Sequence, residues 1–552
     1  MSIALQKITD YLDAMAQKNP FQAAIIFPEG RDKEGRVAYT HVTYAQLQEE
    51  TDALSMWFLE QNIVKGERCA VMIRPSIDFF LVTFSLLRIG AVPVFIDPGI
   101  GSHYLKKCLA AAAPTVFIGI AKAQIARMLF GWSKDTIKKV FTVGSRFGFG
   151  GICLHRYKKE SSKRRPLPPS SAQDLAAILF TSGSTGEPKG VLYKHAHFMS
   201  QVDALRELYN IEPSERDLCT FPLFALFAPA LGMTAIIPDM DFQRPKDVDP
   251  RKLVEAIDNF GVQNFFGSPA LLRTFGQYLA KNPRTFPTLK RILSAGAPVP
   301  SEVLRLIKPC LTGKADIYTP YGATECLPVA SMGASEILQE TAKLSERGFG
   351  VCVGKPIKGI KVRIIQVSDS PISVMEPSLQ VPKGTIGEIT VCGKHATEQY
   401  YRRPESTQSA KIKDKETGLL WHRMGDLGYV DEKGRLWYCG RKTQRVKTKN
   451  GDLYTDAIEG IFNGHKAVLR TALVGVKEGD SEGAVLCVET RERADKEEKA
   501  RIKRDLLTLA AKDPRTSAID KVLFHKSFPV DIRHNSKIFR EKLKDWATKE
   551  LS

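Results

Sequence analysis

A loop rich in glycine and hydroxyl groups is the segment of this chain best suited to chemistry. Residues 181–190 read Thr-Ser-Gly-Ser-Thr-Gly-Glu-Pro-Lys-Gly and follow directly on the apolar run 176–180. The glycines let the backbone approach an anion and turn N–H groups toward it, and the hydroxyls and Lys189 add further donors. This is not a Walker A loop, because Lys189 is followed by Gly190 where that loop needs Ser or Thr. The segment therefore predicts a phosphate-binding loop at the end of a buried strand.

The elements ahead of this loop alternate between apolar strands and helices. We expect an amphipathic helix from a Thr43 cap to Gln61 and a second helix over 78–88. Apolar runs predict strands at 68–73, 91–96, 115–118, 140–143 and 176–180. This alternation predicts an α/β fold, with a large layered N-terminal domain over 1–440 built on mostly parallel sheet. The basic, helix-rich remainder, 441–552, predicts a small mobile α+β C-terminal domain.

Composition excludes several classes of protein. The chain has 552 residues, 43% hydrophobic, with 80 Lys+Arg against 61 Asp+Glu and a net charge of +19. Collagen, coiled coil and disorder do not fit these values. The most apolar stretch, 79–98, carries Arg88 and Asp97, so we expect no membrane span, and the N-terminus does not resemble a signal peptide. Basic and acidic residues are mixed along the chain without a nucleic-acid-binding motif, which argues against a nucleic-acid partner.

Cysteine spacing and one basic cluster bear on compartment and partners. Ten cysteines occur without CxxC or zinc spacing, which indicates free thiols and a cytoplasmic protein. Basic residues gather over 155–165, ahead of the proline-rich stretch 166–171. They favour a solvated loop, with attraction to an anionic membrane surface or an acidic partner enzyme as the alternative.

The string at 181–190 is the most specific signature of the adenylate-forming superfamily, which this chain resembles over nearly its whole length. That superfamily contains acyl- and aryl-CoA synthetases, peptide-synthetase adenylation domains and luciferases. Further matches follow in the family's order at 43–47, 90–98, 294–298, 321–325, 387–389, 425–427, 440–441 and Lys537. The resemblance implies that the enzyme joins a carboxylate to ATP, giving an acyl-adenylate and pyrophosphate.

The resemblance also assigns roles to individual residues. Thr185 and Glu325 would hold Mg²⁺, Tyr321 would stack on adenine, and Asp426 would accept hydrogen bonds from the ribose hydroxyls. Lys537, from the C-terminal domain, would reach the carboxylate and α-phosphate, so Lys537, Glu325 and Thr185 form the implied catalytic set. The implied ATP-binding set is Thr181, Ser182, Gly183, Ser184, Thr185, Gly186, Lys189, Gly296, Ala297, Pro298, Tyr321, Gly322, Thr324, Asp426 and Arg441.

A largely apolar stretch, 221–232, stands where the CoA ligases of the superfamily often have an aromatic-His pair, with Ala225 at the histidine position. With 265–269 and 326–329 it predicts an apolar acyl tunnel containing Phe224, Ala225, Phe227, Phe266, Gly267 and Cys326. Met424 is another departure, because the family usually has Thr there.

The stretches 221–232, 321–331 and 533–543 are most similar to the β-lactone synthetases of bacterial long-chain olefin biosynthesis. The resemblance implies a fatty-acid-type substrate, a 3-hydroxy acid, whose own hydroxyl displaces AMP and closes a four-membered ring. The alternative is a long-chain acyl-CoA or acyl-carrier-protein ligase that uses the same ATP residues. The residues do not identify the base that takes the hydroxyl proton.

Overall fold

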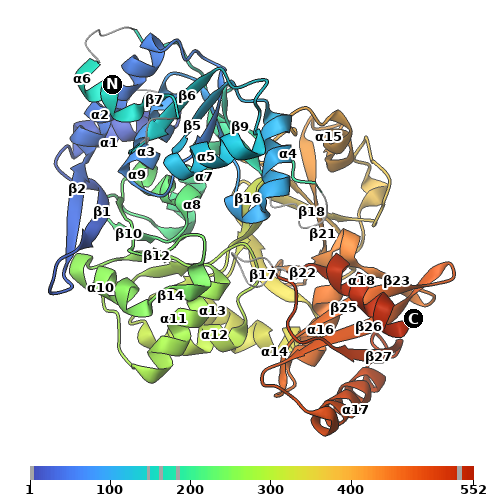
Figure 1. The fold of residues 1–552 in the computed structure, drawn as a ribbon. Helices are drawn as coiled ribbons and strands as arrows, with labels where there is room; N and C mark the ends of the chain where they lie inside the picture. The colour runs from blue at the N-terminus through green and yellow to red at the C-terminus, as the bar shows by residue number, and fades with distance from the viewer. Residues whose placement is uncertain (1–4, 146–149, 161–165, 182–186, 531–537) are drawn as a thin grey trace.

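Two seven-stranded sheets and one eight-stranded sheet form the larger part of the molecule (Figure 1). The structure is a computed structural model that describes residues 5–145, 150–160, 166–181, 187–530 and 538–552. The first sheet has the order β7 (Ile152–Cys153), β6 (Lys139–Val143), β5 (Val116–Ile120), β3 (Arg68–Met72), β4 (Val92–Phe95), β8 (Leu175–Phe180) and β9 (Gly190–Lys194). All neighbouring pairs in it are parallel except β8 with β9.

The second sheet repeats this arrangement. Its order is β14 (Asp316–Tyr318), β13 (Arg291–Leu293), β12 (Asn264–Phe266), β10 (Arg216–Cys219), β11 (Thr234–Ile236), β1 (Ala23–Arg31) and β2 (Val37–Thr43). Only the edge pair of β1 and β2 is antiparallel. In open parallel sheets, ligands bind beyond the carboxyl ends of the strands. The predicted phosphate loop follows the carboxyl end of β8, which is the expected place.

Helix α3 (Ile77–Arg88) lies in the core that the two sheets share. Every residue from Phe79 to Arg88 is buried, which is the pattern of a helix covered on all sides. Arg88 is neutralised by Asp13 and Asp52, with 2.6 Å from Nη1 to Asp52 Oδ1. Neighbouring α2 (Tyr44–Glu60) begins at a Thr43–Gln46 capping box, as the sequence predicts.

The remaining helices of this part cover the sheets. They are α1 (Asp10–Lys18), α4 (Ser102–Ala112), α5 (Ala121–Phe130), α6 (Tyr157–Glu160), α7 (His195–Tyr209), α8 (Pro222–Ala225), α9 (Phe227–Leu231), α10 (Pro250–Phe260), α11 (Pro269–Lys281), α12 (Ser301–Ile307), α13 (Ala334–Glu336) and α14 (Ala342–Ser345). None of the helices in the described part of the chain is long and apolar enough to cross a membrane.

The third sheet is antiparallel, so the expectation of mostly parallel sheet holds for only two of the three large sheets. Its order is β15 (Tyr321–Ala323), β16 (Cys326–Ser331), β17 (Val351–Pro356), β22 (Leu436–Arg441), β21 (Leu420–Val430), β19 (Gly387–Cys392) and β18 (Lys361–Ile365), with β20 (Lys411–Lys413) also on β21. Helix α15 (Pro404–Ala410) precedes β20. Short turns join β15 to β16 and β21 to β22, which yields antiparallel pairs, whereas most of the other neighbouring strands of this sheet come from more distant segments.

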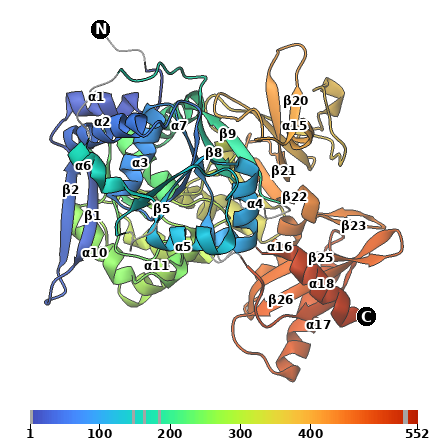
Figure 2. The same cartoon turned by 45° about the horizontal axis from the view of Figure 1, so that its top comes forward.

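The residues after 440 gather on one side of the molecule (Figures 1 and 2). Their elements are β23 (Val446–Thr448), β24 (Gly451–Leu453), α16 (Thr455–Asn463), β25 (Val468–Glu478), β26 (Ser481–Thr490), α17 (Lys496–Lys512), β27 (Ile519–Phe524) and α18 (Arg540–Leu551). Two apolar clusters, on either face of β25–β27, are formed by residues after 445 alone. This is the packing that a domain boundary near 440 predicts; the division into two domains and the mobility of the second stay predictions.

Candidate active site

A cavity of about 550 Å³ opens where strands of all three large sheets end. That volume is within the usual range for a small-molecule site. One group of lining residues, the apolar arm, comes mainly from α3, α7, α8 and α9: Ile8, Thr83, Phe84, Leu87, Phe198, Leu223, Phe224, Leu226, Phe227 and Ala230. A second group, the polar arm, comprises Thr181, Glu187, Lys189, Thr324, Glu325, Tyr400, Ser406, Ser409, His422, Arg423, Arg441 and Lys442.

The base of the phosphate loop is closed by two hydrogen bonds. Thr181 N–H donates to the Lys189 carbonyl oxygen at 3.0 Å, and Lys189 N–H donates to Thr181 Oγ1 at 3.2 Å. Both residues line the cavity, as predicted for an anion site, and Lys189 Nζ lies 5.2 Å from the centre of the Tyr400 ring. Ser182, Gly183, Ser184, Thr185 and Gly186 lie outside the described residues, so their predicted roles rest on the sequence alone.

The side chain of Glu325 faces the same cavity from the turn between β15 and β16. Tyr400 Oη donates to its Oε1 at 2.6 Å, and the Thr397 backbone N–H donates to its carbonyl oxygen at 2.8 Å. The Lys411 ammonium lies nearby, and burial lowers its pKa to about 8, although the charge of Glu325 opposes that shift. Sequence analysis missed Tyr400 and Lys411, because no motif marks either residue.

These residues fit a magnesium ion bound together with ATP. Mg²⁺ commonly takes one or two protein carboxylates and completes its shell with phosphate oxygens and water. The Glu325 carboxylate, in the same cavity as Lys189, matches that donor set, and the Tyr400 hydroxyl holds this carboxylate in place. No cluster of three or more potential metal-ligating side chains occurs among the residues that the structure describes.

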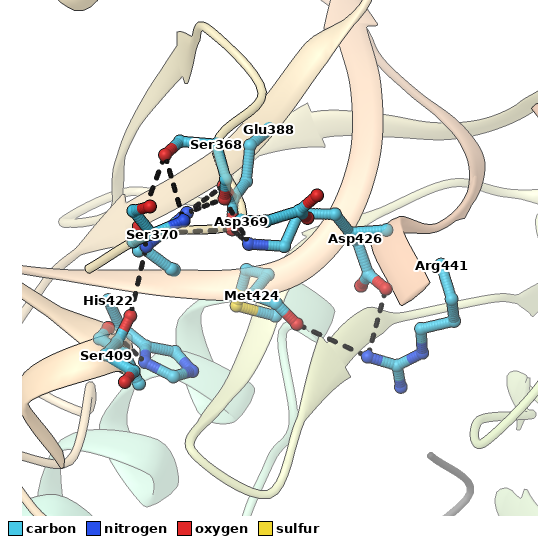
Figure 3. Close-up of polar contacts among 12 residues, drawn as sticks. Ser368, Asp369, Ser370, Glu388, Ser409, His422, Met424, Asp426 and Arg441 are labelled. Atoms are coloured by element: carbon cyan, nitrogen blue, oxygen red, sulfur yellow. Dashed lines mark hydrogen bonds and ion pairs between the residues drawn. The ribbon is translucent and has the colours of Figure 1, made fainter. Parts of the chain in front are cut away.

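Strands β21 and β22 pair Arg441, which lines the polar arm, directly with the buried Asp426. Asp426 and Tyr321 are not themselves among the lining residues. Arg441 Nη1 lies 3.0 Å from Asp426 Oδ1 (Figure 3). Tyr321 Oη donates to Asp426 Oδ2 at 2.6 Å. Burial raises the pKa of Asp426, while Arg441 and the Tyr321 hydrogen bond act in the opposite direction. The structure therefore brings together three residues that the sequence analysis placed around one nucleoside.

The other predicted nucleotide residues are close by, with some differences. Gly296, Gly322 and Thr324 line the cavity, and so does Ala295. Ala297 and Pro298 follow Gly296 in the chain but are not among the lining residues. Met424, which departs from the family pattern, lines the cavity and accepts a hydrogen bond from Arg441 through its carbonyl oxygen at 3.3 Å. The presence of Met in place of the family's Thr at position 424 therefore does not affect this hydrogen bond, because Arg441 donates to the backbone carbonyl oxygen.

A buried ion cluster formed by Arg423, Glu388 and Lys442 also lines the cavity. Arg423 forms two hydrogen bonds to Glu388, of 3.0 and 2.6 Å, and Lys442 Nζ lies 3.0 Å from the same carboxylate. The carbonyl oxygens of Ser368, Ser370 and Ser409 accept further hydrogen bonds from the Arg423 guanidinium, and that of Ser368 also accepts one from Lys442 Nζ (Figure 3). Lys442 lies directly after Arg441, so this cluster anchors the start of the C-terminal segment. Glu388 falls within the motif match at 387–389, but no sequence motif indicated that Arg423 and Lys442 would be its partners.

The predicted acyl residues divide into three groups. Phe224 and Phe227 line the main cavity, and both also line a second cavity of about 80 Å³. Phe266 lines only that second cavity, and its ring contacts Phe224 edge-to-face with 4.8 Å between centroids. Ala225 and Cys326 are buried in the surrounding core, and neither they nor Gly267 are among the residues lining either cavity. Lys537 lies outside the described residues.

Comparison with known proteins agrees with this geometry. A relative from Xanthomonas campestris pv. campestris, named olefin beta-lactone synthetase, is 45% identical over 551 residues, covering 99% of this chain and 98% of the relative. A protein of the same name from Stenotrophomonas maltophilia is 46% identical over 547 residues, or 98% of each chain. A 4-chlorobenzoate–CoA ligase from Arthrobacter is 26% identical over 482 residues, covering 84% of this chain and 81% of the ligase.

Solved structures share the fold. ATP-bound MatB from Rhodopseudomonas palustris superposes with a TM-score of 0.77 at 21% identity, covering 99% of this chain and 100% of that one. O-succinylbenzoate coenzyme A synthetase from Bacillus subtilis, in complex with ATP and magnesium ion, gives 0.75 at 17% identity, covering 97% and 99%. The sequence pattern of AMP-binding enzymes matches residues 12–401. The resemblance seen in the motifs is confirmed, and the chain belongs to the AMP-binding enzyme family.

Proposed function

We propose that this enzyme activates a long-chain 3-hydroxy fatty acid with ATP and closes the resulting acyl-adenylate to a β-lactone. The observation that carries the proposal is the single cavity with two arms, one lined by charged and hydroxyl groups and one by apolar side chains. Two olefin beta-lactone synthetases that are 45% and 46% identical to this chain over nearly its full length support the same reaction. The ten unpaired cysteines support a reducing compartment, and we propose the cytoplasm.

In the first step, a carboxylate oxygen attacks the α-phosphorus of ATP and pyrophosphate leaves. Two anions must approach each other, so the protein has to supply positive charge and oriented donors. We assign the phosphate tail to the 181–189 loop, in which Lys189 supplies positive charge. Asp426, held by Arg441 and Tyr321, is positioned to accept hydrogen bonds from the ribose. Mg²⁺, held by Glu325 and by Thr185 of the loop, would neutralise phosphate charge when bound.

In the second step, the 3-hydroxyl oxygen attacks the acyl carbon, the bond from that carbon to AMP breaks, and the hydroxyl proton is lost. The attack is intramolecular, so it benefits from proximity and needs no second substrate in the cavity. An apolar arm that holds the chain keeps the hydroxyl beside the activated carbonyl. We also propose that residues 441–552 act as a separate domain that brings Lys537 to the carboxylate and α-phosphate.

Mass spectrometry of the products formed from long-chain 3-hydroxy acids and ATP, with and without CoA, tests this proposal. We expect AMP, pyrophosphate and a β-lactone in both mixtures. An acid that lacks the 3-hydroxyl should stop at acyl-AMP. Acyl-CoA as the main product, with plain and 3-hydroxy acids used equally well, would instead establish an acyl-CoA ligase.

A further inference from the structure

The imidazole of His422 is a buried polar group in which, among the described residues, only one of the two ring nitrogens has a hydrogen-bond partner. The residue is 2% exposed and lines the main cavity. Its Nδ1 lies 3.2 Å from the Ala410 carbonyl oxygen, which can only accept, so Nδ1 carries the proton and donates. Within the described residues, that bond is the only one made by the ring. Nε2 is therefore an unprotonated nitrogen available to whatever occupies the cavity.

His422 lies on the phosphate side of the polar arm. His422 and Asp426 are four positions apart in β21, with Gly425 in a left-handed conformation (φ 67°) between them (Figure 3). Asp426 marks the ribose end. At the other end, β20 pairs Lys411 with His422, and the charge of Lys189 acts on the imidazole. The Tyr401 N–H donates to the Gly190 carbonyl oxygen at 2.7 Å, which joins this end to the phosphate loop.

The surroundings keep this imidazole neutral in the absence of a ligand. Burial holds the pKa of His422 well below its usual value, and the positive charge of Lys411 lowers it further, followed by Lys189. Both charged groups acting on the ring are cationic, and Ser409 and Ala410 on the facing α15 carry no charge. The same two lysines make this end of the cavity attractive to an anion. A polyphosphate placed here would reverse the balance, because a nearby negative charge favours the protonated imidazole.

We propose that His422 is a proton-linked contact for the phosphate tail of ATP, neutral without the nucleotide and cationic when the tail is bound. The inference rests on the proposed function, since it requires ATP in this cavity. The proton comes from solvent when ATP binds, and the imidazolium Nε2–H then donates to a phosphate oxygen. When pyrophosphate leaves, the proton returns to solvent. His422 thus contributes a positive charge that is present only while there is an anion to bind.

The coupling between ATP binding and proton uptake by His422 sets the direction in which ATP affinity changes with pH. The protonated ring belongs to the complex, so ATP affinity rises as pH falls through the pKa of the complex and stops rising below the pKa of the free enzyme. One linked proton changes the affinity by at most about tenfold per pH unit. ATP phosphates titrate as well, so the contribution of His422 is the difference between the wild type and a variant that cannot titrate.

The test is calorimetric binding of Mg·ATP to the full-length protein, without acid substrate, in two buffers of different ionisation enthalpy at about pH 7. We compare the wild type with His422→Gln and His422→Asn, which cannot take up a proton. His155→Gln is the matched control, because that histidine is half-exposed, hydrogen-bonded to Asp78 and absent from the cavity lining. Thermal unfolding shows which variants are folded.

We expect the wild type and His155→Gln to take up more protons per ATP than either His422 variant, by up to about one proton. Between about pH 8 and about pH 6, the wild type should also gain affinity more steeply than the His422 variants. Equal proton uptake and parallel pH profiles would overturn the inference and point to a water or hydroxyl donor on Nε2. Failure of the wild type to bind ATP would overturn the proposed function itself, which is a different result.

Discussion

The two arms of the cavity are built by different means. In and beside the polar arm, carboxylates are held by specific partners: Glu325 by Tyr400, Asp426 by Arg441 and Tyr321. In the apolar arm the lining side chains come from α3, α7, α8 and α9 and continue the same core that joins the two parallel sheets. Because an unpaired buried charge is costly, one arm depends on individual pairs, whereas the other depends on shape and total apolar area. Single substitutions in the polar arm should therefore have large effects on stability or activity, whereas those in the apolar arm should have small effects that scale with the apolar area lost.

The largest effect is expected at Arg423, which lines the polar arm and pairs with Glu388. Its guanidinium and the Glu388 carboxylate are 4% and 0% exposed. Arg423→Leu leaves that carboxylate buried with Lys442 as its remaining cation, which should cost about 3–5 kcal/mol of folding free energy. Denaturant unfolding measures the loss. Arg36→Leu, at an exposed ion pair, should change stability by less than about 0.5 kcal/mol. Equal effects at both arginines would contradict the dependence of this arm on individual pairs.

The next effect concerns Lys537, the C-terminal lysine that we propose brings a positive charge to the polar arm. Lys537→Ala should lower acyl-adenylate formation by about 10²–10³, the range expected for the loss of one oriented charge contact in a transition state. Pyrophosphate release in the presence of the acid is the readout, and thermal stability should stay near that of the wild type. Lys526→Ala, at an exposed position of the same C-terminal segment, is the control. If Lys537→Ala forms adenylate at the wild-type rate, the assigned role is wrong.

Substitutions of Glu325 and Tyr400 should raise the Mg²⁺ requirement of the enzyme to different degrees. Glu325→Gln removes the charge proposed for Mg²⁺, so the Mg²⁺ concentration for half-maximal activity should rise strongly. Tyr400→Phe removes only the 2.6 Å hydrogen bond that orients the carboxylate, and the same quantity should rise by about tenfold or less. Titration of the rate with Mg²⁺ for both variants checks the order. An unchanged profile in Glu325→Gln would move the metal site elsewhere, and a Tyr400 effect equal to the Glu325 effect would mean that the hydroxyl does more than orient.

The same difference between the arms explains what the sequence could predict. Short motifs made the predicted phosphate loop, Glu325, Asp426 and Arg441 recognisable. Polar residues assigned to ligand binding occur there together in short strings of sequence. The alternating elements of the first parallel sheet were predictable for a similar reason, since buried strands and capped helices such as α2 have strong local patterns. The antiparallel sheet, Tyr400 and the Arg423–Glu388 pair depend on contacts between distant segments, which no local pattern encodes. Among the acyl residues, Phe227 and Ala225 have the same apolar surroundings in sequence, and only packing decides that one lines the cavity and the other is covered.

The smallest effect tests the apolar arm. Phe227 lines both cavities, and Phe227→Leu keeps the wall apolar while reducing its contact with a bound chain. Each methylene that loses its burial costs about 0.8 kcal/mol, so one such loss lowers kcat/KM for a long-chain acid by about fourfold. An acid too short to reach the ring should be unaffected, and so should the KM for ATP, because the polar arm is untouched. Phe130→Leu, at a half-exposed ring on α5, is the control. The measurement is kcat/KM over a series of chain lengths in wild type and both variants. A loss that is equal at every chain length, or one that appears in the KM for ATP, would show that Phe227 supports the whole cavity and that the two arms are not energetically separate.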